Sequence, residues 1–287
     1  ILFSSFLNSV FDKAIWELYK CSIIELMNKN LIKYFNFNET TRSDNCISSV
    51  HRGWSGLLII KLKISKGSIV DNTYIQNNFF EISNKEKILT VISGKLEATF
   101  DNKAQRMMEE YDSVSFSSDQ KKYTFICEED TVAFIVASRD VEDSKYLDLV
   151  FFNFKKDIQI IDLWGGKIIS RPYEGKKLNF VLFEIKEGFK FDDPGHLNEQ
   201  ITWLIKGSMN FYVGDIKKTL LPNDGVDVGP HEKHGGISDG AIGFDAFYPK
   251  REEKKYKNNP VDKVKRSIKA YGYTKTFFRI LKYPFRK

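Results

Sequence analysis

The chain has 287 residues, 42% of them hydrophobic and 29% charged, so it can bury a sizeable core and does not have the composition of a disordered polymer. Its formal net charge of +6 is uneven, because residues 250–287 carry fourteen Lys and Arg against three Asp and Glu and the remaining residues sum to −5. A nucleic-acid-binding domain normally carries its basic surface on the folded body, so this acidic body argues against that class.

The three cysteines, Cys21, Cys46 and Cys127, are scattered and show no CxxC spacing. This pattern argues against a disulfide framework and against a cysteine-based zinc site, and it predicts a reducing compartment, the cytoplasm. No run approaches the roughly 18 consecutive apolar residues that a membrane-spanning helix needs. The sequence also lacks a Gly-rich phosphate loop and the HExxH pattern of zinc proteases.

The first segment has a helical pattern. Apolar residues recur at three- and four-residue steps from Phe3 to Leu18, and a second helical stretch covers about Ser22 to Tyr34. We therefore expect residues 1–46 to form a helical N-terminal extension that packs on the body or on a partner chain. A helix lying on a membrane surface is the alternative.

From about residue 47 the pattern changes to short segments rich in Ile, Val, Phe and Thr, separated by Gly, Asn and Asp turns. A second β-rich block runs from about Lys167 to Tyr248. Many short strands without intervening helices predict an all-β sandwich or barrel. In the first block we expect strands at Leu57–Ile64, Ile88–Ile92, Lys95–Phe100, Ser113–Phe116, Tyr123–Cys127 and Thr131–Ala137.

The two β-rich blocks look like copies of each other. Glu86–Phe100 aligns with Glu199–Val213 at an offset of 113 residues, and Tyr111–Phe125 aligns with Asn223–Ile237 at an offset of 112. Both copies keep the order of a strand, a Gly turn, a strand, an Asp-centred turn and a strand. We therefore predict two homologous β-barrels, at residues 47–145 and 146–249.

Residues 250–287 leave the β pattern and form a basic C-terminal extension, with an amphipathic helix expected over Val261–Tyr271. Three interpretations of this extension stay open. It is a solvated appendage, or it contacts an anionic membrane surface or a polyanionic glycan. Binding to nucleic acid is the third and least expected interpretation.

Three of the four histidines, His196, His231 and His234, lie in the second block. Neutral imidazole is the commonest metal ligand in proteins. Because residues i and i+4 of a strand face one side, we expect His196 and Gln200 to point together into the barrel, with His234 coming from another strand. Nitrogen and oxygen ligands of this kind suit a divalent ion such as Zn, Fe, Ni or Mn.

The order Gly188, Pro194, His196, Gln200 and Gly207 resembles the first motif of the cupin superfamily, G-x5-H-x-H-x3–4-E-x6-G. The segment Leu221–Gly236 resembles the second cupin motif, with His234 at its metal-binding histidine. The resemblance implies a mainly β protein with two tandem cupin barrels of the double-stranded β-helix or jelly-roll type. It also implies that His196, Gln200 and His234 are metal ligands.

This sequence departs from the motif at two positions. Pro194 stands where the motif has its first histidine, and Gln200 stands where it has a glutamate. Asp192 or Asp193 is a candidate to compensate. A barrel mouth in which His196 and His234 are hydrogen-bonded polar residues without a metal is the alternative. His231, in a loop, is expected beside the ligands or exposed.

The segment Gly243–Glu252 places Asp245, Phe247 and Arg251 at D-x-F-x3-R spacing. Together with His196–Gln200, it resembles the small cupins of pectin and alginate degradation, which convert 4,5-unsaturated uronates to linear ketonised sugars. The resemblance implies that Asp245, Phe247 and Arg251 act on the substrate. Asp245 is then the carboxylate for proton transfer, and Arg251 offers a bidentate fork to the substrate carboxylate. A rim or core role is the alternative for each of them.

Two hypotheses of function follow. The first is a metal-dependent cupin enzyme that acts on a small carbohydrate acid. The second is a non-catalytic bicupin with a decayed metal site that binds a sugar or an anion. A cupin of another chemistry, such as a dioxygenase or a lyase, is a third reading, because one barrel hosts many reactions. Four aromatic residues, each with a core role as its alternative, are candidates for sugar stacking: Trp164, Trp203, Phe211 and Tyr212.

The first barrel lacks these chemical groups. At the offsets above, Gln200 corresponds to Lys87 and His234 to Lys122. Two lysines at ligand positions would repel a cation, so we expect the first barrel to be a metal-free structural partner, and the protein to be able to form a homo-oligomer. The remaining correspondences are His196 with Ser83, Asp245 with Ile135, and Phe247 with Ala137.

Overall fold

The computed structural model describes residues 33–37, 41–43, 46–53, 56–82, 85–101, 104–117, 122–138 and 149–251. The chain divides into two compact units, Ile1–Lys250 and Arg251–Lys287, and both sheets belong to the first. The helices expected before residue 33 and over Val261–Tyr271 lie outside the described residues. The helix expected to reach Tyr34 is wrong at its end, because Lys33–Asn36 forms strand β1.

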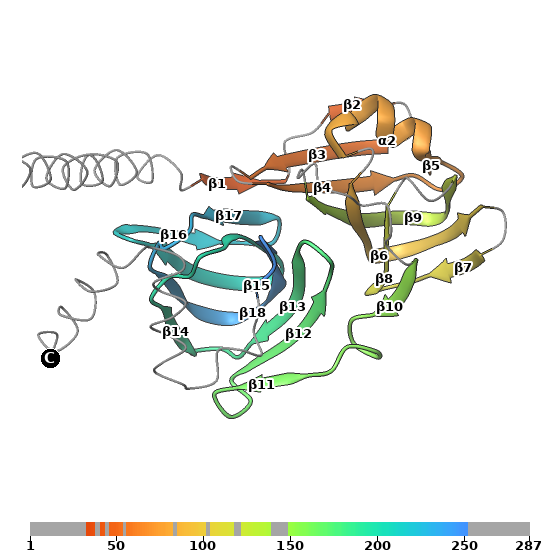
Figure 1. The fold of residues 1–287 in the computed structure, drawn as a ribbon. Helices are drawn as coiled ribbons and strands as arrows, with labels where there is room; N and C mark the ends of the chain where they lie inside the picture. Colours follow the sequence, from red (N-terminus) through yellow and green to blue (C-terminus); the bar gives the residue numbers. More distant parts are fainter. Residues whose placement is uncertain are drawn as a thin grey trace, which may run out of the picture. The chain divides into compact units, whose positions relative to one another are not determined.

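The described part of the first unit consists of two antiparallel sheets of nine strands each (Figure 1). The prediction of a mainly β fold with two barrels is therefore confirmed. The first sheet runs in the order β10-β8-β6-β9-β4-β3-β2, with β5 paired to β9 and β7 to β6. Its strands are β2 (Thr41–Ser43), β3 (Cys46–Arg52), β4 (Leu57–Ile64), β5 (Ile69–Asp71), β6 (Glu86–Phe100), β7 (Ala104–Met108), β8 (Asp112–Ser117), β9 (Tyr123–Ser138) and β10 (Val150–Asn153).

The second sheet repeats this order as β1-β17-β15-β18-β13-β12-β11, with β14 paired to β18 and β16 to β15. Every strand of one sheet therefore has a counterpart in the other, as a duplication requires. Besides β1, its strands are β11 (Ile161–Leu163), β12 (Ile168–Glu174), β13 (Asn179–Ile185), β14 (Lys190–Asp193), β15 (Glu199–Val213), β16 (Ile216–Leu220), β17 (Asp224–Val228) and β18 (His234–Tyr248).

The two copies differ most in the connection from β5 to β6, which corresponds to the connection from β14 to β15. In the first barrel this connection holds helix α2 (Asn72–Asn78) and the short 3-10 helix η1 (Phe80–Ile82). Asp71 caps α2, since its Oδ1 accepts a hydrogen bond from the amide of Tyr74 at 2.8 Å. In the second barrel only residues 194–198 connect β14 to β15, and this short loop carries His196.

Strands that were expected in pairs are continuous. Ile88–Ile92 and Lys95–Phe100 both lie in β6, and the register shifts between them as in a β-bulge. Gly94 permits the bulge, because its φ is +85° and an added Cβ would lie 2.3 Å from the carbonyl oxygen of Asp130. The equivalent Gly207 of β15 has a φ of +72°. A glycine inside these long strands therefore bends the strand without ending it.

Three apolar cores hold the unit together, one inside each barrel and one between them. The core between the barrels is rich in aromatic side chains, and Trp203 is fully buried in it. Phe180 stacks on both Trp203 and Phe244 with ring centroids 5.7 and 4.7 Å apart. Residues of both barrels therefore contribute to one apolar core that joins them.

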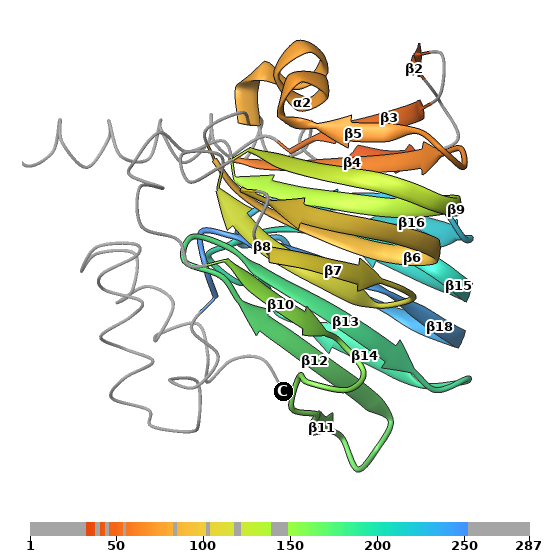
Figure 2. The ribbon, with the colours of Figure 1, turned by 90° about the vertical axis from the view of Figure 1, so that its right-hand side faces the viewer.

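The barrels also exchange strands. β1 precedes the first barrel in the sequence but pairs with β17 of the second sheet, and β10 precedes the second barrel but pairs with β8 of the first. Figure 1 shows red β1 beside blue β17 and green β10 beside yellow β8. Figure 2 shows the strands of the two sheets from the side. Each barrel thus covers the edge strand of the other, and neither exposes β8 or β17 as a free edge.

Side-chain contacts at this exchange follow the same symmetry. Phe35 of β1 stacks on His51 with ring centroids 3.7 Å apart, and its counterpart Phe152 of β10 stacks on Tyr173 at 4.0 Å. His51 then contacts Asp227 of the other barrel, with 3.3 Å between Nε2 and Oδ2. Tyr173 likewise bonds to Ser115, which is the counterpart of Asp227. The two copies share the geometry and differ in chemistry, with His51 and Asp227 in one and Tyr173 and Ser115 in the other.

Matched substitutions separate the two pairs. His51→Phe and Tyr173→Phe both keep the ring that stacks on a phenylalanine. We expect His51→Phe to lower the free energy of unfolding by about 3 kcal/mol, because it removes the imidazole beside a buried carboxylate. We expect Tyr173→Phe to cost about 1 kcal/mol, the usual worth of a neutral hydrogen bond. Urea denaturation measures both, and equal losses would contradict an energetic role for the ionisable pair.

Candidate metal centre

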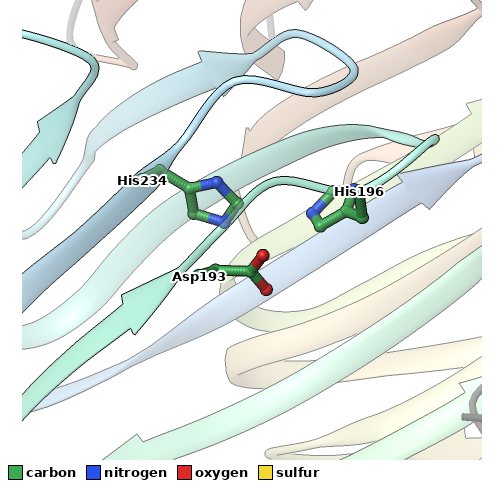
Figure 3. A group of neighbouring side chains, drawn as sticks. All are labelled: Asp193, His196 and His234. Carbon is green, nitrogen blue, oxygen red and sulfur yellow. The ribbon is translucent and has the colours of Figure 1, made fainter. Parts of the chain in front are cut away.

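Three side chains of the second barrel converge on one point. Asp193 ends β14 and lies opposite His234, the first residue of β18, in the register of the sheet. His196 reaches the same point from the loop that follows β14 (Figure 3). One ligand atom from each residue lies within 4.8 Å of the others. Among the described residues, this is the one group of three or more His, Cys, Asp or Glu that meets this criterion.

His196 does not lie in a strand, so the expectation that it shares a strand face with Gln200 is wrong. The loop at residues 194–198 turns back and places the imidazole beside Gln200, with 2.8 Å between Nε2 and Oε1. The carbonyl oxygen of His196 accepts a hydrogen bond from the amide of His231 at 2.6 Å. His231 therefore braces the loop through its main chain, and its side chain is not part of the cluster.

The orientation of His234 follows from one hydrogen bond. Its Nδ1 lies 2.9 Å from the main-chain carbonyl oxygen of Glu232, which can only accept. Nδ1 therefore carries the proton in the neutral imidazole, and the lone pair lies on Nε2. A backbone carbonyl that fixes a histidine tautomer in this way is a common feature beside metal ligands. The imidazole of His234 is buried and stacks on the ring of Phe211, with 6.0 Å between the ring centroids.

A chain of hydrogen bonds orients Gln200. Its Nε2 donates to Thr202 Oγ1 at 2.8 Å and to Asp245 Oδ1 at 3.2 Å. The Thr202 hydroxyl in turn donates to Asp245 Oδ1 at 2.6 Å. Because the amide nitrogen is engaged with these two groups, the amide oxygen Oε1 faces His196. Asp245 therefore acts on the orientation of Gln200 and lies in the same barrel interior.

These donors fit a divalent metal ion. The donor atoms of Asp193, His196 and His234 lie within 4.8 Å of one another, and His196 Nε2 lies 2.8 Å from Gln200 Oε1. These side chains would have to close around an ion for all of them to bind it at about 2.0–2.2 Å. Two imidazoles, a carboxylate and an amide oxygen suit the borderline ions Zn, Fe, Ni and Mn.

The structure distinguishes the two aspartates that the sequence left open. Asp193 joins the cluster, whereas Asp192 is exposed and lies 3.1 Å from Lys233 Nζ. The hydroxyl of Tyr212 also donates to Asp192, and this bond together with Lys233 holds the pKa of that carboxyl below its usual value. Pro194 is exposed. The carboxylate of Asp193 thus lies in the cluster that lacks the first histidine of the motif.

Five residues predicted from the sequence lie together in this barrel: His196, Gln200, His234, Asp245 and Phe247. Phe247 contacts His196 with ring centroids 5.5 Å apart. Arg251 belongs to the second compact unit and stays a prediction. The sequence predicts Asp193 only as an alternative to Asp192 in the role of substitute donor. The position that distinguishes Asp193 is the last residue of strand β14, directly before the loop that carries His196.

The aromatic candidates for sugar stacking divide by burial. Trp203 and Phe211 are core residues, so their core alternative is correct. Tyr212 bonds to Asp192, and burial together with that bond raises its pKa to about 12. Trp164 is 61% exposed at the turn between β11 and β12.

In the first barrel the equivalent positions hold no comparable group among the described residues. The strand register pairs Val213 with His234 and Phe100 with Tyr123, so the counterpart of His234 is Tyr123. The correspondence of His234 with Lys122 is therefore wrong by one residue. Lys87 does occupy the place of Gln200, where it is fully buried and donates to the carbonyl oxygens of Ile82 and Lys85 at 2.8 and 2.9 Å. Ser83 lies outside the described residues.

No protein-family model matches the chain, and the search of curated proteins finds no match. Solved structures do match. The protein Ylba from E. coli is similar to 76% of this chain over 90% of its own length, with 15% identity and a TM-score of 0.60. A cupin 2 conserved barrel domain protein from Leptotrichia buccalis matches 76% of this chain over 96% of its length, with 12% identity and a TM-score of 0.53.

A variant of oxalate decarboxylase from Bacillus subtilis matches 76% of this chain over 77% of its own length, with 10% identity and a TM-score of 0.56. This chain has a cupin fold. Identities of 10–15% carry the fold and nothing finer. The assignment of the fold is thus supported by the strand order of the chain and by these similar structures. Within the described residues, no helix is long and apolar enough to cross a membrane.

The histidine loop offers a test of the cluster. Gly195 has a φ of +96°, and an added Cβ would lie 2.7 Å from the carbonyl oxygen of His231. We expect Gly195→Ala to displace His196 and to weaken the binding of Zn²⁺ at least 10-fold by isothermal titration calorimetry. Gly188→Ala is the matched control, because Gly188 also has a positive φ but nothing lies within 4 Å of its added Cβ. Equal weakening in both variants would contradict this role of the loop.

Proposed function

We propose that this chain is a metal-dependent cupin enzyme that acts on a small carbohydrate acid. Its specific reaction is proposed to be the ring opening and ketonisation of a 4,5-unsaturated uronate. The observation that carries the proposal is the cluster of Asp193, His196 and His234 in the barrel that also contains Asp245 and Phe247. A donor cluster and an ordered carboxylate in one interior are the parts that metal-assisted sugar chemistry needs.

The ion would be held by His196, His234 and Asp193, with Gln200 as a further oxygen donor. A divalent ion bound there supplies a Lewis acid that polarises oxygen atoms of a sugar. The surrounding side chains hold the donors in place. Glu232 fixes the ring of His234 through its carbonyl oxygen, and Thr202 fixes the amide of Gln200.

Asp245 is proposed to move the proton. Ketonisation of an unsaturated uronate requires a proton to leave an oxygen atom and another to reach a ring carbon, and Asp245 is the carboxylate beside Gln200. The hydrogen bonds from Thr202 and Gln200 to its Oδ1 hold the group in one orientation. Phe247 forms an apolar wall beside His196. Arg251 is proposed to bind the substrate carboxylate through its two-pronged guanidinium.

The metal site has a direct test. We expect the purified protein, dialysed against Zn²⁺ and then against buffer, to retain about one ion per chain by plasma emission spectrometry. His234→Ala and Asp193→Asn remove a donor each, and we expect them to lower the affinity at least 10-fold. Asp192→Asn is the control, because that neighbouring carboxylate faces Lys233 outside the cluster. Retention that is unchanged by His234→Ala would rule out this centre.

The substrate has a separate test. A 4,5-unsaturated uronate absorbs in the ultraviolet through its conjugated double bond, so its ketonisation is followed as a loss of absorbance. We expect the metal-loaded protein to remove this absorbance, and Asp245→Asn to lower kcat by about 100-fold or more. Asp239→Asn, on the same strand but exposed, should leave kcat unchanged. Zinc binding without any loss of absorbance would contradict the uronate reaction and leave the metal site standing.

One observation favours the second candidate function, a non-catalytic bicupin that binds a sugar or an anion. His196 and Gln200 are already within hydrogen-bond distance, at 2.8 Å, which is also how a metal-free barrel would satisfy these two polar groups. This candidate and the enzyme differ in one measurement. A non-catalytic bicupin retains no stoichiometric metal, and His234→Ala does not alter its ligand affinity.

A further inference from the structure

The residue directly before Gln200 connects the candidate metal centre to the other barrel. Glu199 is fully buried, and its Oε2 accepts hydrogen bonds from the amides of Gly56 and Leu57 at 3.2 and 3.3 Å. Both amides belong to the first barrel, since Gly56 precedes β4 and Leu57 is its first residue. A side chain of the second barrel is thus bound by the main chain of the first.

The carboxylate of Glu199 is closely packed. A Cβ added to Gly53 would lie 2.2 Å from Glu199 Oε1, so only a glycine leaves room for the carboxylate at this position. Gly56 meets the ring of Tyr248 in the same way, and Tyr248 is the residue opposite Glu199 in the register of β15 and β18. The first barrel therefore contacts both the first residue of β15 and the last residue of β18.

The reverse contact is present as well. Glu86, the counterpart of Glu199, accepts hydrogen bonds from the amides of Lys176 and Lys177 of the second barrel, both at 2.8 Å. Gly175 faces it as Gly53 faces Glu199, since its added Cβ would lie 2.5 Å from Glu86 Oε1. Burial raises the pKa of Glu86, and the two amide bonds oppose that shift. The same clamp thus occurs twice, once in each direction.

Only one of the two clamps lies next to the candidate metal centre. The residue after Glu199 is Gln200, whose Oε1 lies 2.8 Å from His196 Nε2. The residue after Glu86 is Lys87, which bonds to main-chain carbonyls. Glu199 directly follows the loop at residues 194–198 that carries His196. The hydrogen bonds to its carboxylate therefore fix the chain at the C-terminal end of that loop.

We propose that Glu199 is a positioning residue through which the first barrel sets the metal affinity of the second. The proposal rests on the proposed metal centre and adds a role for the barrel that carries no ligands. Glu199 does not touch the ion. It holds the main chain at Gln200 and the end of the histidine loop, so the spacing of the donors depends on amides of the other barrel.

Glu199→Gln and Glu86→Gln test this role as a matched pair. Each exchanges a charged carboxylate for a neutral amide, which weakens the charge-assisted bonds from the main-chain amides and places a nitrogen that cannot accept a hydrogen bond in the contact. We expect both variants to lower the midpoint of urea unfolding by a similar amount. Only Glu199→Gln should weaken Zn²⁺ and Mn²⁺, by 10- to 100-fold, and alter the visible absorption of bound Co²⁺, which reports the arrangement of its ligands.

The outcomes separate the two proposals. Folded Glu199→Gln protein with the affinity and Co²⁺ spectrum of the unmodified chain would overturn the role of Glu199 and leave the metal centre intact. An unmodified chain that binds none of these ions would overturn both. If Glu199→Gln does not fold, Gly53→Ala and Gly175→Ala replace the pair, because each pushes on one of the two carboxylates. Equal metal affinity in these two glycine variants would likewise overturn the role of Glu199.

Discussion

A carboxylate removed from water must be met by hydrogen-bond donors, and this requirement governs how the two barrels of this chain join. Glu86 and Glu199 are both buried, and each finds its two donors in the main chain of the opposite barrel. The apolar core around Trp203 supplies the larger share of buried area, but apolar contact has no direction. The two carboxylates add direction, because only one relative placement of the barrels brings two amides to each of them. Strand exchange through β1 and β10 is consistent with that same placement.

On this common frame the two interiors have diverged. The second barrel points imidazole, carboxylate and amide groups inward, whereas the first has Tyr123 and Ile135, both in its apolar core, at the positions of His234 and Asp245. Lys87 is the exception, since its Nζ is buried, donates to two carbonyl oxygens and lies 5.5 Å from the ring centre of Phe116. The first barrel therefore holds a lysine, satisfied by its own main chain, at the position of a proposed metal ligand in the second.

The sequence predicts most of the fold, because the duplication is visible in the spacing of its strands, and Leu57–Ile64 matches β4 residue for residue. It fails where a contact is distant in the chain. The predicted helical stretch reaches Tyr34, but Lys33–Asn36 forms strand β1, which pairs with β17 about 190 residues later. The predicted counterpart of His234 is Lys122, whereas the strand register gives Tyr123. Such a one-residue error matters because it moves a side chain to the other face of the sheet. His196 was expected in a strand, and the loop that carries it depends on the conformation of Gly195. The choice of Asp193 over Asp192 likewise needed the pairing of β14 with β18.

Strand exchange has a consequence for the order in which the chain is made. β10 leaves the ribosome soon after β8, so the first sheet can close before the second barrel has been synthesised. β1, in contrast, is synthesised long before the strand with which it pairs. Asn36 bonds to Asp224, which lies 188 positions later, and at about 5–20 residues per second the strand waits for about 10–40 s. During that interval β1, the first strand of the described residues, lacks the edge that it joins in the folded protein. β1 can therefore join its sheet only after β17 (Asp224–Val228) has been synthesised.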